Sequence, residues 1–157
     1  EAVASKPGLN AVDLFQAIDD GTVKALWIMA TNPVDSLPEA DFIRQALKKC
    51  PFVVVSDVSA KTDTTELADV LLPSEAWGEK DGTVTNSERC ISRQRAFMKP
   101  PFEAKADWWQ ICEVAKRLGF EEQFAFSSAR DIFIEHAALS GFENEQARDL
   151  IFLHFRG

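Results

Sequence analysis

The chain has 157 residues, of which 46% are hydrophobic and 27% charged, enough for one globular domain with a core of its own. Its formal net charge of -8 argues against a nucleic-acid partner, because phosphate binding needs Lys and Arg clustered over a broad face. No apolar run approaches the roughly 20 residues that span a bilayer, and no signal segment is visible, so we expect a cytoplasmic protein without a membrane partner.

The residue types that usually form metal or catalytic centres are few and scattered. The three cysteines are odd in number and widely spaced, and neither His136 nor His154 has a second ligand at a suitable distance in sequence. There is no GxSxG elbow and no HExxH motif. We therefore expect no metal site and no catalytic residue within this chain. The chain begins EAVASKPG without an initiator Met, so we also expect it to be a piece of a longer protein.

A helix and then a buried strand are predicted near the start. Asn10 is suited to cap a helix with an apolar stripe, which Asp20 and Gly21 end. The strand predicted over 23–30 is almost continuously apolar, which is typical of a strand buried on both faces of a parallel sheet. Thr31 to Pro33 break it.

A second helix and two more strands follow. Ser36 to Glu39 have the form of a capping box that starts a helix running to Leu47. Strands are predicted over 52–55 and 69–72, and Pro73 cannot continue the last one as a central ladder residue. The order strand, helix, strand, connection, strand predicts an α/β fold with a parallel, doubly wound sheet.

Polar residues follow three predicted strands at the point where each ends. These are Thr31 with Asn32, Ser56 with Asp57, and the residues beyond Leu72. Taken singly, each also fits a helix cap or a turn, but three in succession favour a ligand crevice beyond the carboxyl ends of the strands. No GxGxxG is present, so the sequence does not support a standard nicotinamide or flavin site.

The second half is predicted to form a helical C-terminal part. One helix covers 107–118 and stops at Gly119, and Ser128 opens another that runs to Gly141. Lys99 to Glu103 contain two prolines and are predicted to be a stiff extended connector within one domain.

The segment 68–95, ADVLLPSEAWGEKDGTVTNSERCISRQR, gathers hydrogen-bonding groups behind the last strand. Glu79 to Gly82 read as a turn, and a dense polar run ends at Arg89. Arg89, Arg93 and Arg95 have no acid between them, so the local potential opposes the overall negative charge. From residue types alone, a solvated hairpin fits this segment as well.

This segment resembles the molybdopterin-guanine-dinucleotide oxidoreductases of the dimethyl sulfoxide reductase family, and within them the assimilatory nitrate reductases. The resemblance extends from about Pro7 to about Arg148, through TNPVDSLP, VVVSDVSAKTDTTELADVLLP, DWW and IFIEHAALSGFEN. The family's pattern of an acid, Lys, a small residue, Gly, Thr, and then Asn, Glu and Arg is present as Glu79, Lys80, Gly82, Thr83, Asn86, Glu88 and Arg89.

The resemblance implies a domain of a larger catalytic subunit that reduces nitrate to nitrite at molybdenum. Residues 1–148 would form one molybdopterin guanine dinucleotide-binding α/β domain, and 149–157 would be a tail where the resemblance is lost. The metal ligand and the iron–sulfur cluster would lie on the remaining domains of the parent enzyme, so this segment alone is expected to be inactive. The alternative is a cofactor-free scaffold domain of a related electron-transfer complex, which would have no need of converging polar groups.

The resemblance also implies which residues contact the cofactor. Asp57 is the first choice for guanine and Asp63 the second, because a carboxylate accepts from both N1–H and the exocyclic amine of that base. Ser36 fits either a phosphate contact or a helix cap. Lys80, Asn86 and Arg89 would face the pterin or its pyrophosphate. The full implied set is Thr31, Asn32, Pro33, Ser36, Ser56, Asp57, Thr62, Asp63, Lys80, Gly82, Asn86 and Arg89.

Overall fold

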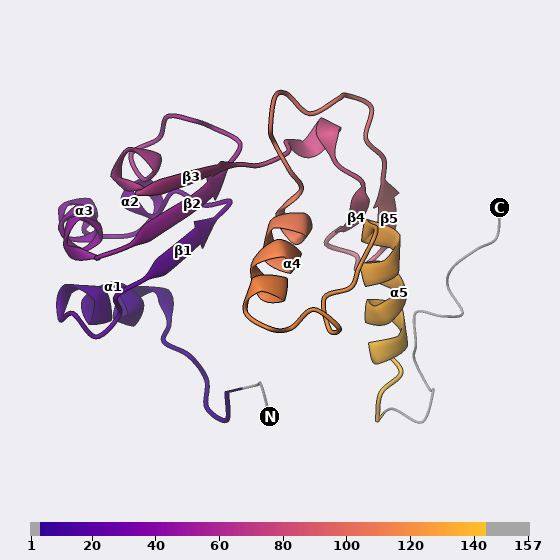
Figure 1. Ribbon diagram of the computed structural model, residues 1–157, viewed down its shortest axis with the longest axis horizontal. Coiled ribbons are helices and arrows are strands. Elements are labelled where there is room, and N and C mark those ends of the chain that lie inside the picture. Colours follow the sequence, from indigo (N-terminus) through magenta and orange to yellow (C-terminus); the bar gives the residue numbers. More distant parts are fainter. Residues whose placement is uncertain (1–3, 144–157) are drawn as a thin grey trace. The chain divides into compact units, whose positions relative to one another are not determined.

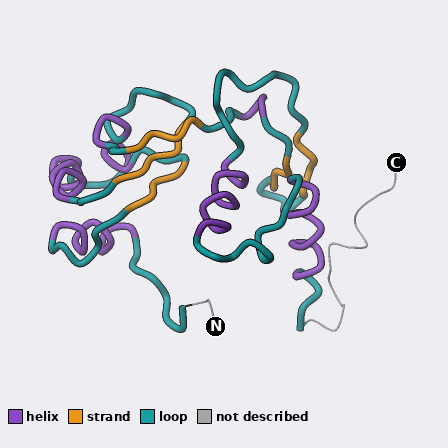
Figure 2. The backbone as a smooth tube through the Cα atoms, viewed as in Figure 1, coloured by secondary structure: helices purple, strands orange, loops and turns teal. Residues whose placement is uncertain are grey.

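The chain divides into two compact units, Glu1–Ser74 and Glu75–Gly157. A computed structural model of the protein describes residues 4–143 (Figure 1). The first unit combines a sheet with helices, and the second combines a hairpin with helices (Figure 2). The whole predicted tail, 149–157, lies outside the described residues, as does Arg148.

The first unit is built on a parallel sheet of three strands, β1 (Leu26–Met29), β2 (Val53–Asp57) and β3 (Val70–Pro73). Their order in the sheet is β1-β2-β3, so β2 pairs with both neighbours. The predicted α/β class with a parallel sheet is confirmed. Pro73 is the last residue of β3, which pairs with β2 alone in the described sheet, and an edge strand tolerates the missing N–H.

Helices α1 (Ala11–Asp19), α2 (Pro33–Ser36) and α3 (Ala40–Lys49) contribute to the core of this unit, together with the sheet. Val53 and Val55 alternate onto one face of β2, and Ile28 lies opposite Val55 on the same face. They form one cluster with buried helix residues, among them Phe15, Ile18, Val34, Ile43, Ala46 and Leu47. Full burial of each large aliphatic side chain contributes about 1.5–3 kcal/mol, so this face holds the unit together.

The cap of α1 is confirmed, but the capping box predicted for α3 is wrong. The Asn10 Oδ1 atom accepts a hydrogen bond from the Asp13 N–H at 3.0 Å. Ser36, in contrast, is the last residue of α2, and Glu39 occupies the N-cap of α3 with φ 60° and no side-chain cap bond. The reason is Pro33, whose fixed φ starts a separate short helix directly after β1.

The expectation that the first strand is buried on both faces is also wrong. β1 is shorter than the predicted 23–30, and of its residues only Ile28 is buried. Within the described residues β1 pairs with β2 alone, so it is an edge strand of this sheet. Apolar composition alone did not distinguish an edge strand from a central one.

The second unit contains β4 (Gly82–Thr85) and β5 (Ile91–Gln94), which pair as an antiparallel hairpin, followed by α4 (Asp107–Arg117) and α5 (Ala129–Leu139). The predicted helical C-terminal part is confirmed, including the cap of α5, where the Ser128 hydroxyl accepts from the Asp131 N–H at 3.3 Å. Gly119 follows α4 with φ 92°, the left-handed conformation expected of a glycine that stops a helix.

The extended connector predicted over Lys99 to Glu103 is wrong. Phe102 has φ 48°, and the Ala104 N–H donates to the Pro101 carbonyl at 3.1 Å, so the chain turns here. Pro101 is the first residue of this turn and contributes only its carbonyl, which proline retains as an acceptor, so two prolines in sequence did not enforce an extended segment. Among the described residues, no helix has the length and apolar character needed to cross a membrane.

Candidate functional site

The strand-end edge of the first unit begins with Asn32, which follows β1. The buried Thr64 hydroxyl donates to the Asn32 Oδ1 atom at 2.6 Å, and the Val34 N–H donates to the same hydroxyl at 3.3 Å. Pro33 is buried beside them, whereas Thr31 is exposed. Two segments separated in sequence therefore hold the Asn32 amide at the end of β1.

Asp57 and Ser56 end the neighbouring strand in different environments. The Asp57 Oδ1 atom accepts from the Ser59 N–H at 2.8 Å, and the carboxyl group is partly exposed. Ser56 is fully buried, and its hydroxyl accepts from the Trp27 Nε1–H at 2.8 Å. Asp57 is thus partly accessible at this edge, while Ser56 joins β2 to β1.

In the loop between β2 and β3, Thr62 and Asp63 are neighbours with different surroundings. Thr62 and Thr65 form a reciprocal pair, in which each backbone N–H donates to the hydroxyl of the other at 2.6 and 3.1 Å. Asp63 is exposed, and its Oδ2 atom lies 3.7 Å from the Arg44 Nη2 atom on α3. Ser36 is exposed at the end of α2, so its predicted capping role is replaced by a surface position.

Lys80 forms an ion pair in the second unit. Its Nζ atom donates to the Asp107 Oδ2 atom at 2.9 Å, and both side chains are less than a third exposed. The Oδ1 atom of Asp107 is buried and has no hydrogen-bond partner in the described part of the chain. Asp107 thus holds the ammonium group where the chain approaches β4.

Asn86 and Arg89 form the tip of the hairpin. The Arg89 N–H donates to the Asn86 carbonyl at 3.0 Å, and the Cys90 N–H donates to the Asn86 Oδ1 atom at 2.9 Å. Arg89 is exposed and has φ 62°. The hairpin that the residue types allowed is therefore present, and Asn86 closes it. Whether these groups contact a cofactor stays a prediction.

The predicted residues of the second unit do not form one cluster. Gly82 pairs with Gln94 at the open end of the hairpin, whereas Asn86 closes the other end. At about 3.3 Å per residue, β4 separates these ends by roughly 13 Å. Lys80 therefore lies with Gly82, and Arg89 lies with Asn86.

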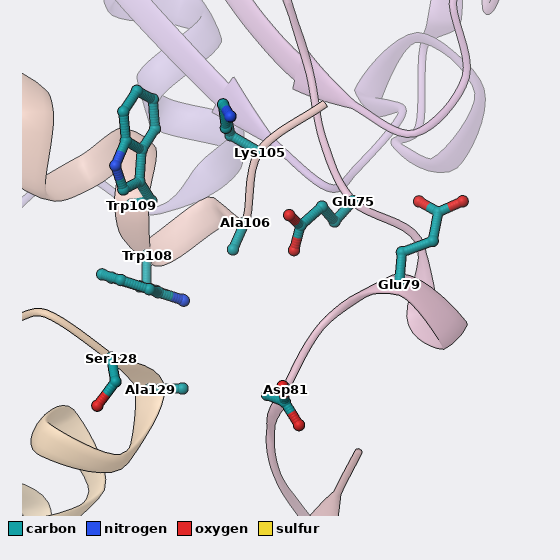
Figure 3. Close-up of a pocket in the computed structure, with 9 residues that line it drawn as sticks. All are labelled: Glu75, Glu79, Asp81, Lys105, Ala106, Trp108, Trp109, Ser128 and Ala129. Carbon is teal, nitrogen blue, oxygen red and sulfur yellow. The ribbon is translucent and has the colours of Figure 1, made fainter. Parts of the chain in front are cut away.

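A pocket of about 370 Å³ lies in the second unit, and its lining includes Glu79 and Asp81, the neighbours of Lys80, but none of the predicted residues themselves. Figure 3 shows three carboxylates, Lys105 and two tryptophans around it; the lining residues are Glu75, Glu79, Asp81, Lys105, Ala106, Trp108, Trp109, Ser128 and Ala129. The Lys105 ammonium is 5.6 Å from the centre of the Trp109 ring. Burial raises the pKa of Glu75, and the charge of Glu79 raises it further. An excess of carboxylates repels phosphate, so this pocket does not fit a nucleotide.

Metal ligands do not converge in the part of the chain that the structure describes. Cys50, Cys90 and Cys112 are all free thiols, and burial raises the pKa of Cys112. A raised pKa reduces the thiolate fraction, which makes Cys112 less suited to bind a metal.

The sequence missed two residues that hold predicted site residues in place. Thr64 lies in the polar loop of which Thr62 and Asp63 were selected, and Asp107 begins the DWW string. Asp107 had a usable signal, since it is an acid in the first turn of a helix and the resemblance passes through it. Thr64 had none, because its partner Asn32 is 32 residues away.

The comparisons with known proteins agree with this architecture. The family described as molybdopterin oxidoreductase matches residues 2–117. A nitrate reductase of Klebsiella oxytoca is 57% identical over 94% of this chain, which spans 17% of that relative. The assimilatory nitrate reductase catalytic subunit of Bacillus subtilis is 38% identical over 83% of the chain and 18% of its own length.

Two further relatives extend the range of activities. The F420-dependent formate dehydrogenase subunit alpha of Methanocaldococcus jannaschii is 43% identical over 80% of this chain and 19% of its own length. The solved structure of acetylene hydratase from Pelobacter acetylenicus covers 88% of this chain and 19% of its own, with a TM-score of 0.66 and 24% identity, which shows a shared fold. The family match over 2–117 and these identities establish that the chain belongs to the molybdopterin oxidoreductase family.

Proposed function

We propose that this chain is the part of a molybdenum-dependent nitrate reductase that binds the nucleotide arm of one molybdopterin guanine dinucleotide. The observation that carries the proposal is the placement of polar groups at the ends of adjacent parallel strands, Asn32 after β1 and Asp57 at the end of β2. In parallel sheets, ligands bind beyond these ends. An amide and a carboxylate at neighbouring strand ends offer both a donor and an acceptor, and a nucleotide carries partners for both.

The residues present fit the nucleotide part of this cofactor. Asp57 offers a carboxylate that accepts one backbone bond, from Ser59, and retains further lone pairs for guanine N–H groups. Arg89 is an exposed guanidinium at the hairpin tip, which suits an anionic group. The chemistry that the bound cofactor supplies is two-electron oxygen-atom transfer, in which nitrate, two electrons and two protons give nitrite and water. The side chains of Asp57 and Arg89 bind and orient the cofactor.

The activity of the whole subunit is proposed from the relatives that match this chain. The chain spans 15–19% of the length of the nitrate reductases that match it, so nitrate reduction is proposed for the whole subunit. The similarity to the Bacillus subtilis assimilatory subunit, and the resemblance of the segment 68–95, favour an assimilatory role in the cytoplasm. We further propose that an iron–sulfur cluster and the metal ligand belong to the remaining domains of that subunit.

Formate oxidation is the second candidate, because a formate dehydrogenase subunit is 43% identical to this chain. The two candidates share the cofactor and differ in the substrate at the metal. None of the described residues is placed as a metal ligand, so the strand-end edge is compatible with both.

The test uses the full-length subunit that contains this chain. After purification, molybdenum is measured by mass spectrometry, and GMP is measured after acid hydrolysis of the cofactor. We expect about one molybdenum and two GMP per subunit, together with nitrate turnover with a reduced viologen. Turnover of formate without nitrate would select the second candidate. A folded subunit without GMP would overturn the proposal in favour of a cofactor-free scaffold domain.

The isolated chain provides the complementary measurement. The 157-residue chain, purified alone, is expected not to reduce nitrate with any donor, because it supplies only one nucleotide arm of the cofactor site. Nitrate turnover that co-purifies with the isolated chain would contradict the proposal that the metal ligand belongs to the remaining domains of the subunit.

A further inference from the structure

The hydroxyl of Thr64 is buried, and its hydrogen-bond partners fix the direction in which its hydrogen points. Thr64 is 0% exposed, and its Oγ1 atom has hydrogen bonds to the Val34 N–H and to the Asn32 amide. The Val34 N–H is a donor and uses one lone pair of the hydroxyl. The hydroxyl hydrogen then needs an acceptor, because an unsatisfied buried polar group costs about 1–3 kcal/mol.

The acceptor is the Oδ1 atom of Asn32, 2.6 Å from Oγ1. If the Asn32 amide were rotated by half a turn, its NH₂ group would face a hydroxyl that already accepts one bond, and the hydroxyl hydrogen would lose this acceptor. The arrangement with Oδ1 toward Thr64 is therefore the favoured one. No hydrogen bond joins the Nδ2 atom of Asn32 to a protein acceptor among residues 4–143.

We propose that Thr64 is a positioning residue, which turns Asn32 so that its NH₂ group reads a hydrogen-bond acceptor oxygen of the bound nucleotide. This inference rests on the proposed function of the strand-end edge. That oxygen is either a phosphate oxygen or the O6 atom of guanine, since both accept from an amide. Asn32 thus donates where Asp57 accepts, so the two strand ends select opposite groups of the ligand.

The positioning role is tested first without ligand. In the labelled 157-residue chain, NMR couplings of the Asn32 side chain are expected to show one rotamer, which Thr64→Val averages and Thr64→Ser retains. Thr22→Val, at an exposed threonine, is the matched control and leaves Asn32 unchanged. A single Asn32 rotamer that survives Thr64→Val overturns the role of Thr64.

The polarity of the amide is tested with ligands. The probes are guanosine diphosphate, its 2,6-diaminopurine counterpart and pyrophosphate, each titrated into the 157-residue chain. Asn32→Asp retains the bond from Thr64 but replaces the outward donor by an acceptor, so we expect binding of guanosine diphosphate to weaken tenfold or more. Thr64→Val is expected to weaken it about three- to tenfold, and Thr64→Ser less than twofold.

A matched control separates polarity from added charge. Gln45→Glu makes the same change from amide to carboxylate on the exposed surface of α3 and is expected to change binding less than twofold. A loss that includes pyrophosphate identifies a phosphate oxygen as the acceptor, and a loss confined to guanosine diphosphate identifies O6. Wild-type affinity in Asn32→Asp overturns the inference. Absence of binding of every probe by the wild-type chain overturns the proposed function instead, and the rotamer measurement then decides the role of Thr64.

Discussion

The ammonium of Lys80 and the carboxylate of Asp107 are 2.9 Å apart and join the chain ahead of the hairpin to the first turn of α4. Asp107 also lies where a negative charge is favourable, because the N-terminal end of a helix carries a partial positive charge. The pair is less than a third exposed on either side, so solvent screens it only in part.

Breaking this pair is expected to destabilise the chain. Lys80→Met or Asp107→Asn should each lower the free energy of unfolding by about 1–2 kcal/mol, because the remaining partner stays partly buried. In urea unfolding of the 157-residue chain, the double variant should cost less than the sum of the single ones, since both remove the same contact. Lys61→Met, an exposed control, should stay within about 0.5 kcal/mol. Strictly additive losses would contradict the coupling.

Substitutions of Arg89 are expected to lower cofactor retention without lowering the stability of the chain. The left-handed conformation costs a residue with a Cβ atom roughly 1–2 kcal/mol, so Arg89→Gly should stabilise the cofactor-free chain. Arg89→Ala should leave thermal stability almost unchanged, because the side chain is exposed. In the full-length subunit, both variants should lower molybdenum content or turnover sharply. Normal cofactor loading in both variants would show that the hairpin is only a solvated structural element.

Asp57→Asn tests the contact with guanine. The amide oxygen is able to keep the bond from Ser59, so the strand end should stay folded. The variant replaces an acceptor by a donor toward the base and removes a charge-assisted bond of about 1.5–3 kcal/mol, which corresponds to a ten- to hundredfold loss of cofactor retention. GMP released from the purified full-length subunit measures the effect. Asp63→Asn is the comparison, and a loss in that variant alone would transfer the role to Asp63.

The raised pKa of Glu75 predicts a pH-dependent stability. Burial first, and then the charge of Glu79, make the folded chain hold this proton more tightly than the unfolded chain. The free energy of unfolding should therefore fall as the pH rises from near 4.5, the ordinary pKa of the group, through the raised pKa of the folded state. Glu75→Gln should reduce this decline in urea midpoints measured between about pH 4 and 7. Glu66→Gln, an exposed control, should keep the wild-type decline.

Local signals predicted the elements well, and contacts distant in sequence explain what was missed. The caps at Asn10 and Ser128 were predictable because each bonds to a residue three positions later. The start of α3 was not, because Pro33 had already begun another helix. The Lys80–Asp107 contact spans 27 residues and depends on how the chain packs. The strand-end pairs were located in sequence, but the orientation of the Asn32 amide requires Thr64, which only the folded chain brings near.

The hydrogen bond from Thr64 orders the Asn32 side chain when the chain folds and not when a ligand binds. A free amide side chain at a binding edge loses rotational freedom on association, at a cost of about 0.5–1.5 kcal/mol. A bond of 2.6 Å from a fully buried hydroxyl restricts Asn32 already in the folded chain, so that entropy is lost during folding. Ligand association at this edge should then proceed without a preceding side-chain rearrangement, and differences in affinity between ligands should appear mainly in their dissociation rates.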